Sequence, residues 1–265
     1  MQTNEKNKFT LEISKDLAMK KLPAEIASRL VEVAYEKYQD EKNDRETFEK
    51  YIQNCSNEEI KIYIPDVYQK DIYRIDYIKL WENGIRLISF DIDDTINDIF
   101  INKIEAKVPG IKVKMPKDAK ELFAKLKSLG FTVTLLTNAG SDLAKAAAEE
   151  LDADGYIARA NKPESMNFKV MQQQYGMEKS QMAHVGNDIR TDIIGGNDFG
   201  IITCLVRRKG FAMKVVKYLG KKIGIPTKGK LIKNELLNRG LWRKHHLKEK
   251  EDQYYQLGEI PKYLR

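Results

Sequence analysis

Cysteine and histidine are scarce in this chain. Its 265 residues include two cysteines and three histidines. Cys55 and Cys204 lie far apart in the sequence and do not form a metal-ligand pair. Cys204 falls within the apolar run 201–206, which predicts a buried thiol. The sparing use of cysteine favours a cytoplasmic protein.

Long apolar runs are missing as well. No run approaches the roughly 20 residues that a membrane-spanning helix needs. The first residues, 1–6, show no basic region followed by an apolar stretch, so we expect no standard secretion signal. A composition of 42% hydrophobic and 32% charged residues indicates a globular core with much solvated surface. The length suffices for one sizeable core with attachments.

Four polar patches occur in a fixed order, and apolar, strand-like runs precede three of them. The runs cover residues 87–90, 133–136 and 183–185. The patches are Asp91-Ile92-Asp93-Asp94-Thr95, Thr137-Asn138, Lys162-Pro163, and Gly186-Asn187-Asp188 with Asp192.

The first patch suggests covalent chemistry at phosphorus. Side chains at positions i and i+2 of an extended segment point to the same side, so Asp91 and Asp93 can converge. A carboxylate can attack phosphorus and hold the phosphoryl group as an aspartyl-phosphate. A second carboxyl can protonate the leaving oxygen and later take a proton from water. We therefore predict Asp91 as nucleophile and Asp93 as general acid/base.

Two carboxylates would repel a phosphoryl group, so positive charge must be supplied. Mg²⁺ prefers an octahedral shell of oxygens that carboxylates, waters and phosphate provide. The predicted ligands are Asp91, Asp93, Asp188 and Asp192.

Three further residues are predicted to bind the phosphoryl group. Lys162 supplies a fixed positive charge, and Thr137 with Asn138 supplies donors for the equatorial oxygens. His184 is expected only to pack or hydrogen-bond at a strand end.

Each patch also has an ordinary structural interpretation. Asp94 can cap a helix, Thr-Asn after an apolar run can form a turn, and Lys162 can be a surface lysine. Gly186-Asn187-Asp188 alone can be a turn. These interpretations need four separate coincidences, whereas one catalytic site accounts for all four patches.

The four patches resemble the sequence motifs of the haloacid dehalogenase (HAD) superfamily of phosphohydrolases. The resemblance covers about residues 65–207. The segment 65–68 and Gly195-Gly196-Asn197 are similar to the capless subfamily IIIA, which includes phosphatidylglycerophosphate phosphatase-like proteins. The resemblance implies a doubly wound, mainly parallel sheet, Mg²⁺ and an aspartyl-phosphate intermediate.

The fourth patch departs from that pattern. Subfamily members often carry Gly-Asp where this chain has Gly186-Asn187-Asp188. Either Asp188 binds the metal and Asp192 supports it, or Asn187 takes the position and weakens metal binding. A hard cation gains more from a carboxylate than from an amide oxygen, which favours Asp188.

Periodicity divides the chain into three regions. Residues 1–60 are predicted to form a helical extension, with Pro23 opening a helix. Residues 61–210 alternate short apolar runs with helical stretches, which indicates an α/β core of parallel βαβ units. Within this core we expect a helix at 117–129 ended by Gly130, a helix at 143–151 capped by Ser141, and strands at 181–185 and 201–206. Residues 211–265 form a basic C-terminal segment.

The basic character is concentrated between residues 207 and 250. This stretch holds 15 Lys or Arg against two acidic residues, a local charge of +13 compared with +7 for the whole chain. Such a segment can contact anionic lipid or nucleic acid. It can equally be a solvated tail that packs on the core through its apolar residues. Both interpretations remain open.

The number of residues between the patches limits what can be inserted over the site, and so bears on the size of the substrate. Too few residues separate the first patch from the next helix, or Asn138 from Lys162, to hold a cap domain. An uncovered site admits a bulky substrate, such as a phospholipid head group or a phosphoprotein, but the amino-terminal helices or another subunit can also cover it. The sequence thus predicts a Mg²⁺-dependent phosphomonoester hydrolase. The alternative is a nucleic-acid-associated or scaffold protein built on a weakly active core.

Overall fold

A six-stranded sheet lies at the centre of the computed structural model, which describes residues 31–98 apart from 33–34 and 37, together with 114–207 and 227–242. Every strand pairing in this sheet is parallel. The strands are β1 (Val67–Gln69), β2 (Leu87–Phe90), β3 (Thr132–Leu136), β4 (Gly155–Ile157), β5 (Met182–Gly186) and β6 (Ile202–Val206). The predicted α/β class with a mainly parallel sheet is confirmed.

The strand order places two of the polar patches side by side. The order is β1-β6-β5-β2-β3-β4, so the chain runs outward from β2 to β4 and then returns with β5 beside β2. Such a reversal is a topological switch point, where open α/β sheets bind ligands beyond the carboxyl ends of their strands. Asp91 directly follows β2 and Gly186 ends β5.

Helices cover both faces of the sheet, as a doubly wound fold requires. On one face α5 (Tyr77–Glu82), α7 (Lys117–Ser128) and α8 (Ser141–Leu151) pack against alternate strand residues such as Phe90. The other face holds α9 (Met166–Tyr175) and α10 (Ile194–Phe199), which pack around Leu87. Neighbouring strand residues serve opposite faces because strand side chains alternate.

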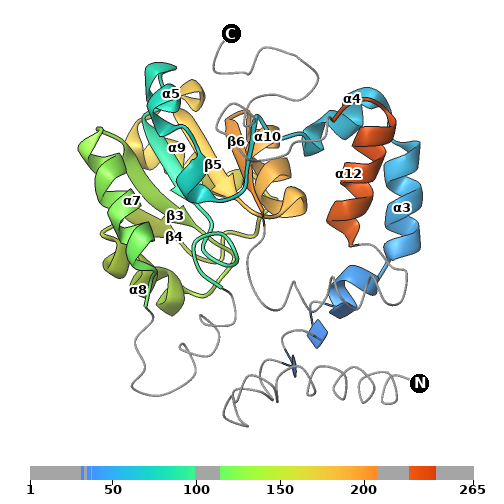
Figure 1. The fold of residues 1–265 in the computed structure, drawn as a ribbon, viewed down its shortest axis with the longest axis horizontal. Helices are drawn as coiled ribbons and strands as arrows, with labels where there is room; N and C mark the ends of the chain where they lie inside the picture. The colour runs from blue at the N-terminus through green and yellow to red at the C-terminus, as the bar shows by residue number, and fades with distance from the viewer. Residues whose placement is uncertain (1–30, 33–34, 37, 99–113, 208–226, 243–265) are drawn as a thin grey trace.

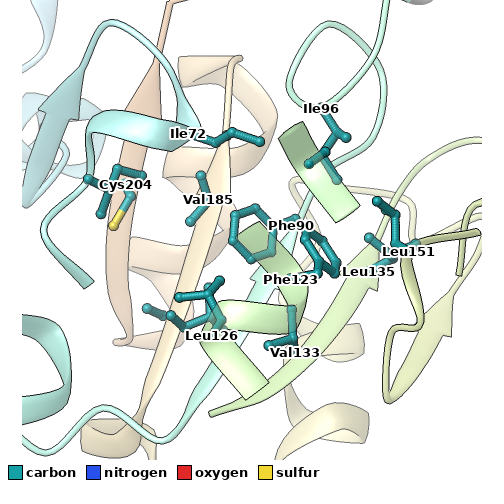
Figure 2. Close-up of a cluster of buried hydrophobic side chains, with 14 of the residues drawn as sticks. Ile72, Phe90, Ile96, Phe123, Leu126, Val133, Leu135, Leu151, Val185 and Cys204 are labelled. Carbon is teal, nitrogen blue, oxygen red and sulfur yellow. The ribbon is translucent and has the colours of Figure 1, made fainter. Parts of the chain in front are cut away.

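The larger core contains a ring pair at its centre. The rings of Phe90 and Phe123 have centroids 5.0 Å apart, and neither side chain is exposed. Figure 2 shows both among the buried aliphatic side chains of β3, β5 and α7. Burying one such side chain contributes about 1.5–3 kcal/mol, so this core gives β2 a rigid base for Asp91.

A second core joins helices from the two ends of the described chain. Helix α3 (Arg45–Asn54) lies beside α12 (Lys228–Asn238) (Figure 1). Short helix α4 (Asn57–Ile60) and the 3₁₀ turn η1 (Lys61–Tyr63) continue the chain toward β1. Ile52, Ile232 and Leu236 are buried here against Tyr68 of β1 and Leu205 of β6. Apolar residues of the basic segment therefore attach α12 to the core, as one of the two interpretations expects.

Several sequence predictions fall outside the described residues. These are the helix opening at Pro23, the stretch 99–113 after the first patch, and most of the basic segment, 208–226 and 243–265. The division at residues 60 and 210 stays a prediction. No helix in the described part of the chain is long and apolar enough to cross a membrane.

The predicted helix ends agree with the structure at one position and differ at another. Helix α7 ends at Ser128, and Gly130 follows with a positive φ of 97°, as the sequence indicates. Ser141 was expected to cap α8, but it is the first residue of that helix. Gly140 occupies the cap position, and no side-chain cap bond forms.

Candidate active site

Lys162 is the hub of a buried polar cluster. Its Nζ donates to Asp91 Oδ1 at 2.9 Å, to Asp192 Oδ1 at 2.6 Å and to the Leu136 carbonyl at 2.9 Å. The residue is only 5% exposed. Burial alone would lower the pKa of Lys162, but Asp192 and Asp91 outweigh it and raise the pKa. Lys162 is thus a permanently charged interior group, and the interpretation as a surface lysine is wrong.

Asn138 fixes the backbone of this lysine. The Lys162 backbone N–H donates to Asn138 Oδ1 at 2.8 Å, and Asn138 Nδ2 donates to the Lys162 carbonyl at 3.2 Å. Asn138 was predicted to donate to a substrate. Its amide binds the Lys162 backbone in both directions, which gives the side chain a positioning role, and its predicted contact with a substrate stays a prediction.

Asp91 is held from three directions. Its backbone N–H donates to the Val185 carbonyl at 2.9 Å, which extends the β2–β5 ladder. Its Oδ1 accepts from Lys162, and its Oδ2 accepts from the Thr95 hydroxyl at 3.2 Å. Burial raises the pKa of Asp91 to about 7, with Lys162 opposing the rise and Asp192 and Asp93 adding to it. Burial therefore makes Asp91 harder to ionise than an exposed aspartate.

Asp192 lies on the far side of Lys162 and is 1% exposed. Its Oδ1 also contacts His184 Nε2 at 3.3 Å, and its Oδ2 accepts from the Asp188 backbone N–H at 2.9 Å. Burial opposes ionisation, but Lys162 and His184 outweigh it and lower the pKa of Asp192. Asp192 is therefore the anion that balances Lys162.

The Asp188 carboxylate pairs with Arg190. Asp188 Oδ1 accepts from the Arg190 backbone N–H at 2.9 Å, and Asp188 Oδ2 lies 3.2 Å from the guanidinium. Arg190 also reaches Glu41 at 3.3 Å and Asp40 at 3.4 Å. These contacts tie the amino-terminal helical region to η4 (Ile189–Ile193), the single π-helical turn that follows Asp188. π-helical turns recur at functional sites.

Asn187 bridges the fourth patch to the first. Its Nδ2 donates to the Asp93 carbonyl and, at 2.8 Å, to Thr95 Oγ1. The amide of Asn187 therefore presents N–H groups to the acidic loop where a carboxylate would present oxygens.

These contacts test the predicted magnesium ligands. Donors of Lys162 and His184 engage Asp192, and Arg190 engages Asp188. Among the described residues, no three Asp, Glu, His or Cys side chains are grouped to hold a metal ion. The predicted four-carboxylate set does not fit Mg²⁺ in this arrangement, and the metal roles of Asp91 and Asp93 stay predictions.

Close packing places the Lys162 loop against α10. A Cβ at Gly195 would lie 2.9 Å from the Pro163 carbonyl oxygen, so only glycine lets α10 approach this loop. Thr137 directly follows β3. It is buried, and its Oγ1 accepts from the Ala139 backbone N–H at 3.1 Å. Its predicted contact with a phosphoryl group stays a prediction.

The sequence interpretation gave no role to three contributors to this site, Ser89, Thr95 and Arg190. His184 was expected to pack or hydrogen-bond at a strand end, and it does both. Ser89 and His184 are polar residues inside apolar strand runs, and they face each other in the β2–β5 register. Buried polar side chains need hydrogen-bond partners. Two polar residues inside adjacent apolar strands therefore could have been predicted to bind each other.

A comparison with protein families supports the predicted class. Residues 98–200 match the family of haloacid dehalogenase-like hydrolases. The matched region contains Thr137, Lys162, Asp188 and Asp192, and it begins after Asp91 and Asp93. The fold and this match indicate a hydrolase.

A curated relative carries a more specific name. The chain is 28% identical over 146 residues to the probable phosphatase YqeG of Bacillus subtilis (strain 168), which covers 55% of this chain and 78% of the relative. Together with the family match, this similarity supports an enzyme of the HAD phosphatase class. The assignment to the capless subfamily IIIA stays a prediction.

Solved structures also resemble the chain. An uncharacterized protein from Listeria monocytogenes serotype 4b has a TM-score of 0.39 and 20% identity, over 53% of this chain and 100% of that one. The HAD-hydrolase YfnB of Bacillus subtilis, bound to magnesium, has a TM-score of 0.37 and 15% identity, over 53% of this chain and 99% of that one. Structural similarity at these TM-scores does not indicate a cofactor or a substrate.

Proposed function

We propose that the protein hydrolyses phosphomonoesters with Asp91 as the nucleophile. The observation that supports this most directly is the contact between Asp91 Oδ1 and Lys162 Nζ, 2.9 Å long, at the switch point between β2 and β5. A buried cation beside a carboxylate can draw a phosphoryl group toward that carboxylate and stabilise the charge that develops on it.

The proposed reaction has two steps. An Asp91 carboxylate oxygen forms a bond to phosphorus while the bond to the leaving oxygen breaks, and Asp93 gives a proton to that oxygen. A water molecule then attacks the aspartyl-phosphate, Asp93 takes the water's proton, and phosphate leaves. Thr137 and Lys162 contact the phosphoryl oxygens in this proposal.

The short connection between Asn138 and Lys162 supports a bulky substrate. Between Asn138 and Lys162 the chain holds only α8 and β4, so no cap domain is inserted there. We propose a phosphoester such as a phospholipid head group. A phosphoprotein fits the same reasoning, and the basic segment 207–250 is proposed to meet anionic lipid or nucleic acid.

One observation favours a second candidate, a scaffold or nucleic-acid-associated protein on a weakly active core. Asn187 donates N–H groups to the acidic loop, and the carboxylates of Asp188 and Asp192 are engaged by donors. Both features work against a strong divalent-cation site, and hence against fast phosphoryl transfer.

The test is hydrolysis of a generic aryl phosphate, with Mg²⁺ and with EDTA, by wild type and by Asp91→Asn. Loss of a nucleophile should lower kcat on the order of a thousandfold or more. Asp142→Asn, at an exposed position in the first turn of α8, is the matched control and should retain activity. Full activity in folded Asp91→Asn would refute the proposal. Absent hydrolysis with steeply salt-dependent RNA binding would favour the second candidate.

A further inference from the structure

We propose that His184 is a positioning residue, which holds Asp192 so that Lys162 Nζ stays on Asp91. This inference rests on the proposed function for its catalytic consequence. The contact geometry on which it depends can be tested separately.

A continuous polar chain runs through the sheet to the nucleophile. Ser89 Oγ lies 2.8 Å from His184 Nδ1, and His184 Nε2 lies 3.3 Å from Asp192 Oδ1. From Asp192 the chain continues through Lys162 to Asp91. Ser89 and His184 have no exposed surface. Water therefore cannot replace a hydrogen bond lost between these two side chains unless the sheet opens.

The partners determine which ring nitrogen carries the proton. The imidazole has no exposed surface, and burial disfavours a charged ring, so we assign it one N–H. The ionised Asp192 can only accept, which requires that N–H on Nε2. Nδ1 then accepts from the Ser89 hydroxyl, whose oxygen lies 2.8 Å from Nδ1 and 3.3 Å from the Ala183 carbonyl, its other acceptor. The Phe168 ring meets the imidazole edge-on, with centroids 5.1 Å apart, and limits its rotation.

His184 acts through Asp192 because the two share one oxygen. Asp192 Oδ1 receives both Lys162 Nζ and His184 Nε2, while Oδ2 receives the Asp188 backbone N–H. Without the imidazole donor, the Asp192 carboxylate can turn toward Lys162 and draw Nζ away from Asp91. The ammonium would then be misplaced for the phosphoryl group, although it would remain buried.

The kinetic test compares two substitutions. His184→Leu keeps an apolar volume but removes the donor, whereas the amide nitrogen of His184→Gln can take the place of Nε2. We expect roughly a tenfold to hundredfold loss of kcat in His184→Leu, as for a displaced catalytic group. His184→Gln should recover most of that loss. Equal losses in two folded variants would show a merely structural role, and unchanged kcat in His184→Leu would overturn the inference.

A spectroscopic test does not depend on activity, and its main readout comes from the wild-type protein. Long-range ¹H–¹⁵N spectra of the imidazoles distinguish the two tautomers, and the chain has only three histidines. Wild type should show one histidine as the Nε2–H tautomer across neutral pH, and its signals should shift in Ser89→Ala. An Nδ1–H tautomer for His184 would overturn the inference. If wild type shows this tautomer but hydrolyses no phosphoester, the proposed function fails while the contact stands.

Discussion

Gly186 lies so close to Asp192 that a Cβ at position 186 would stand 2.2 Å from Asp192 Cγ. The last residue of β5 must therefore lack a side chain for Asp192 to fold back over the strand end. Because Asp192 holds Lys162, the missing Cβ is a condition for the whole buried cluster.

Gly186→Ala should therefore displace Asp192 and disrupt the ion pair with Lys162. Overpacking of this kind costs about 1–3 kcal/mol of unfolding free energy. Activity should fall by roughly a hundredfold because the Lys162 ammonium shifts. Urea denaturation and aryl phosphate hydrolysis measure the two effects.

The matched control for this change is Gly140→Ala. No atom lies within 4 Å of a Cβ built at Gly140, which lies two residues after Asn138. It should keep its activity and should lose less stability than Gly186→Ala, since its only cost is that alanine caps a helix less well than glycine. An equal loss in both variants would show that the crowding at position 186 is not the cause.

Sequence reasoning located the switch point because the relevant signals are local. Each apolar run that precedes a patch became a strand, and the order of the patches placed Asp91 and Gly186 on adjacent strands. Strand β4 went unrecognised because its three residues are exposed or half-buried and carry no apolar run. The pairing of α3 with α12 joins segments far apart in sequence, which periodicity cannot reveal.

The partners of individual side chains were harder to predict. Four carboxylates at one sheet edge suggested a shared metal, yet the structure places a lysine between two of them and an arginine against a third. A sequence shows the sign of each charge but not which donors bind each carboxylate in the folded protein. Arg190 and His184 reach Asp188 and Asp192 because a π-helical turn and a strand pairing bring them there.

Asn187→Asp should create a response to divalent cations. The new carboxylate would face the Asp93 carbonyl oxygen in place of an N–H donor, so the metal-free variant should lose about 1–3 kcal/mol. Mg²⁺ binds such oxygens and would stabilise the folded state by mass action. Thermal unfolding with and without Mg²⁺ should show a larger rise in Tm for Asn187→Asp than for wild type.

Asn187→Ala is the control for that experiment. It removes the amide contacts with Asp93 and Thr95 but adds no charge, so it should lose stability without gaining a response to Mg²⁺. An equal rise in Tm in all three proteins would place the cation elsewhere.

Stability should decline at alkaline pH because of the buried Cys204 thiol. Burial, and then Asp66, raise the pKa of Cys204 above its ordinary value. The unfolded chain releases this proton near pH 8.5, but the folded chain retains it. The stabilising effect is complete below pH 8.5 and is lost as the pH rises, by up to about 1.4 kcal/mol per pH unit.

Urea denaturation between pH 8 and 10 measures this slope. Cys204→Ala should make it shallower by one proton, whatever the truncation does to absolute stability. Val185→Ala, at the position paired with Cys204 in β5, truncates a buried side chain without removing a titratable group and should keep the wild-type slope. Parallel slopes in wild type and Cys204→Ala would contradict the prediction.

Arg239 should be the main polar link between the two appended helices. Its guanidinium donates to the carbonyls of Ile52, at 3.2 Å, and Gln53, at 2.9 Å, in the last turn of α3, and also to the Cys55 carbonyl. Glu235 holds the same guanidinium from within α12, at 2.7 Å. The last carbonyls of a helix have no partner within it and favour a cation. Arg239 therefore stabilises the end of α3 both by its hydrogen bonds and by its positive charge.

Arg239→Met keeps much of the aliphatic stem and removes every donor, so it should lower the unfolding free energy by about 1.5–3 kcal/mol. Arg239→Lys should recover only part of this loss, because an ammonium cannot reproduce the planar fork. Chemical denaturation measures both changes, and Lys230→Met, at an exposed position of α12, is the control for loss of a charge. If Arg239→Met were no less stable than Lys230→Met, the apolar contacts of Ile52, Ile232 and Leu236 would suffice to hold α3 and α12 together.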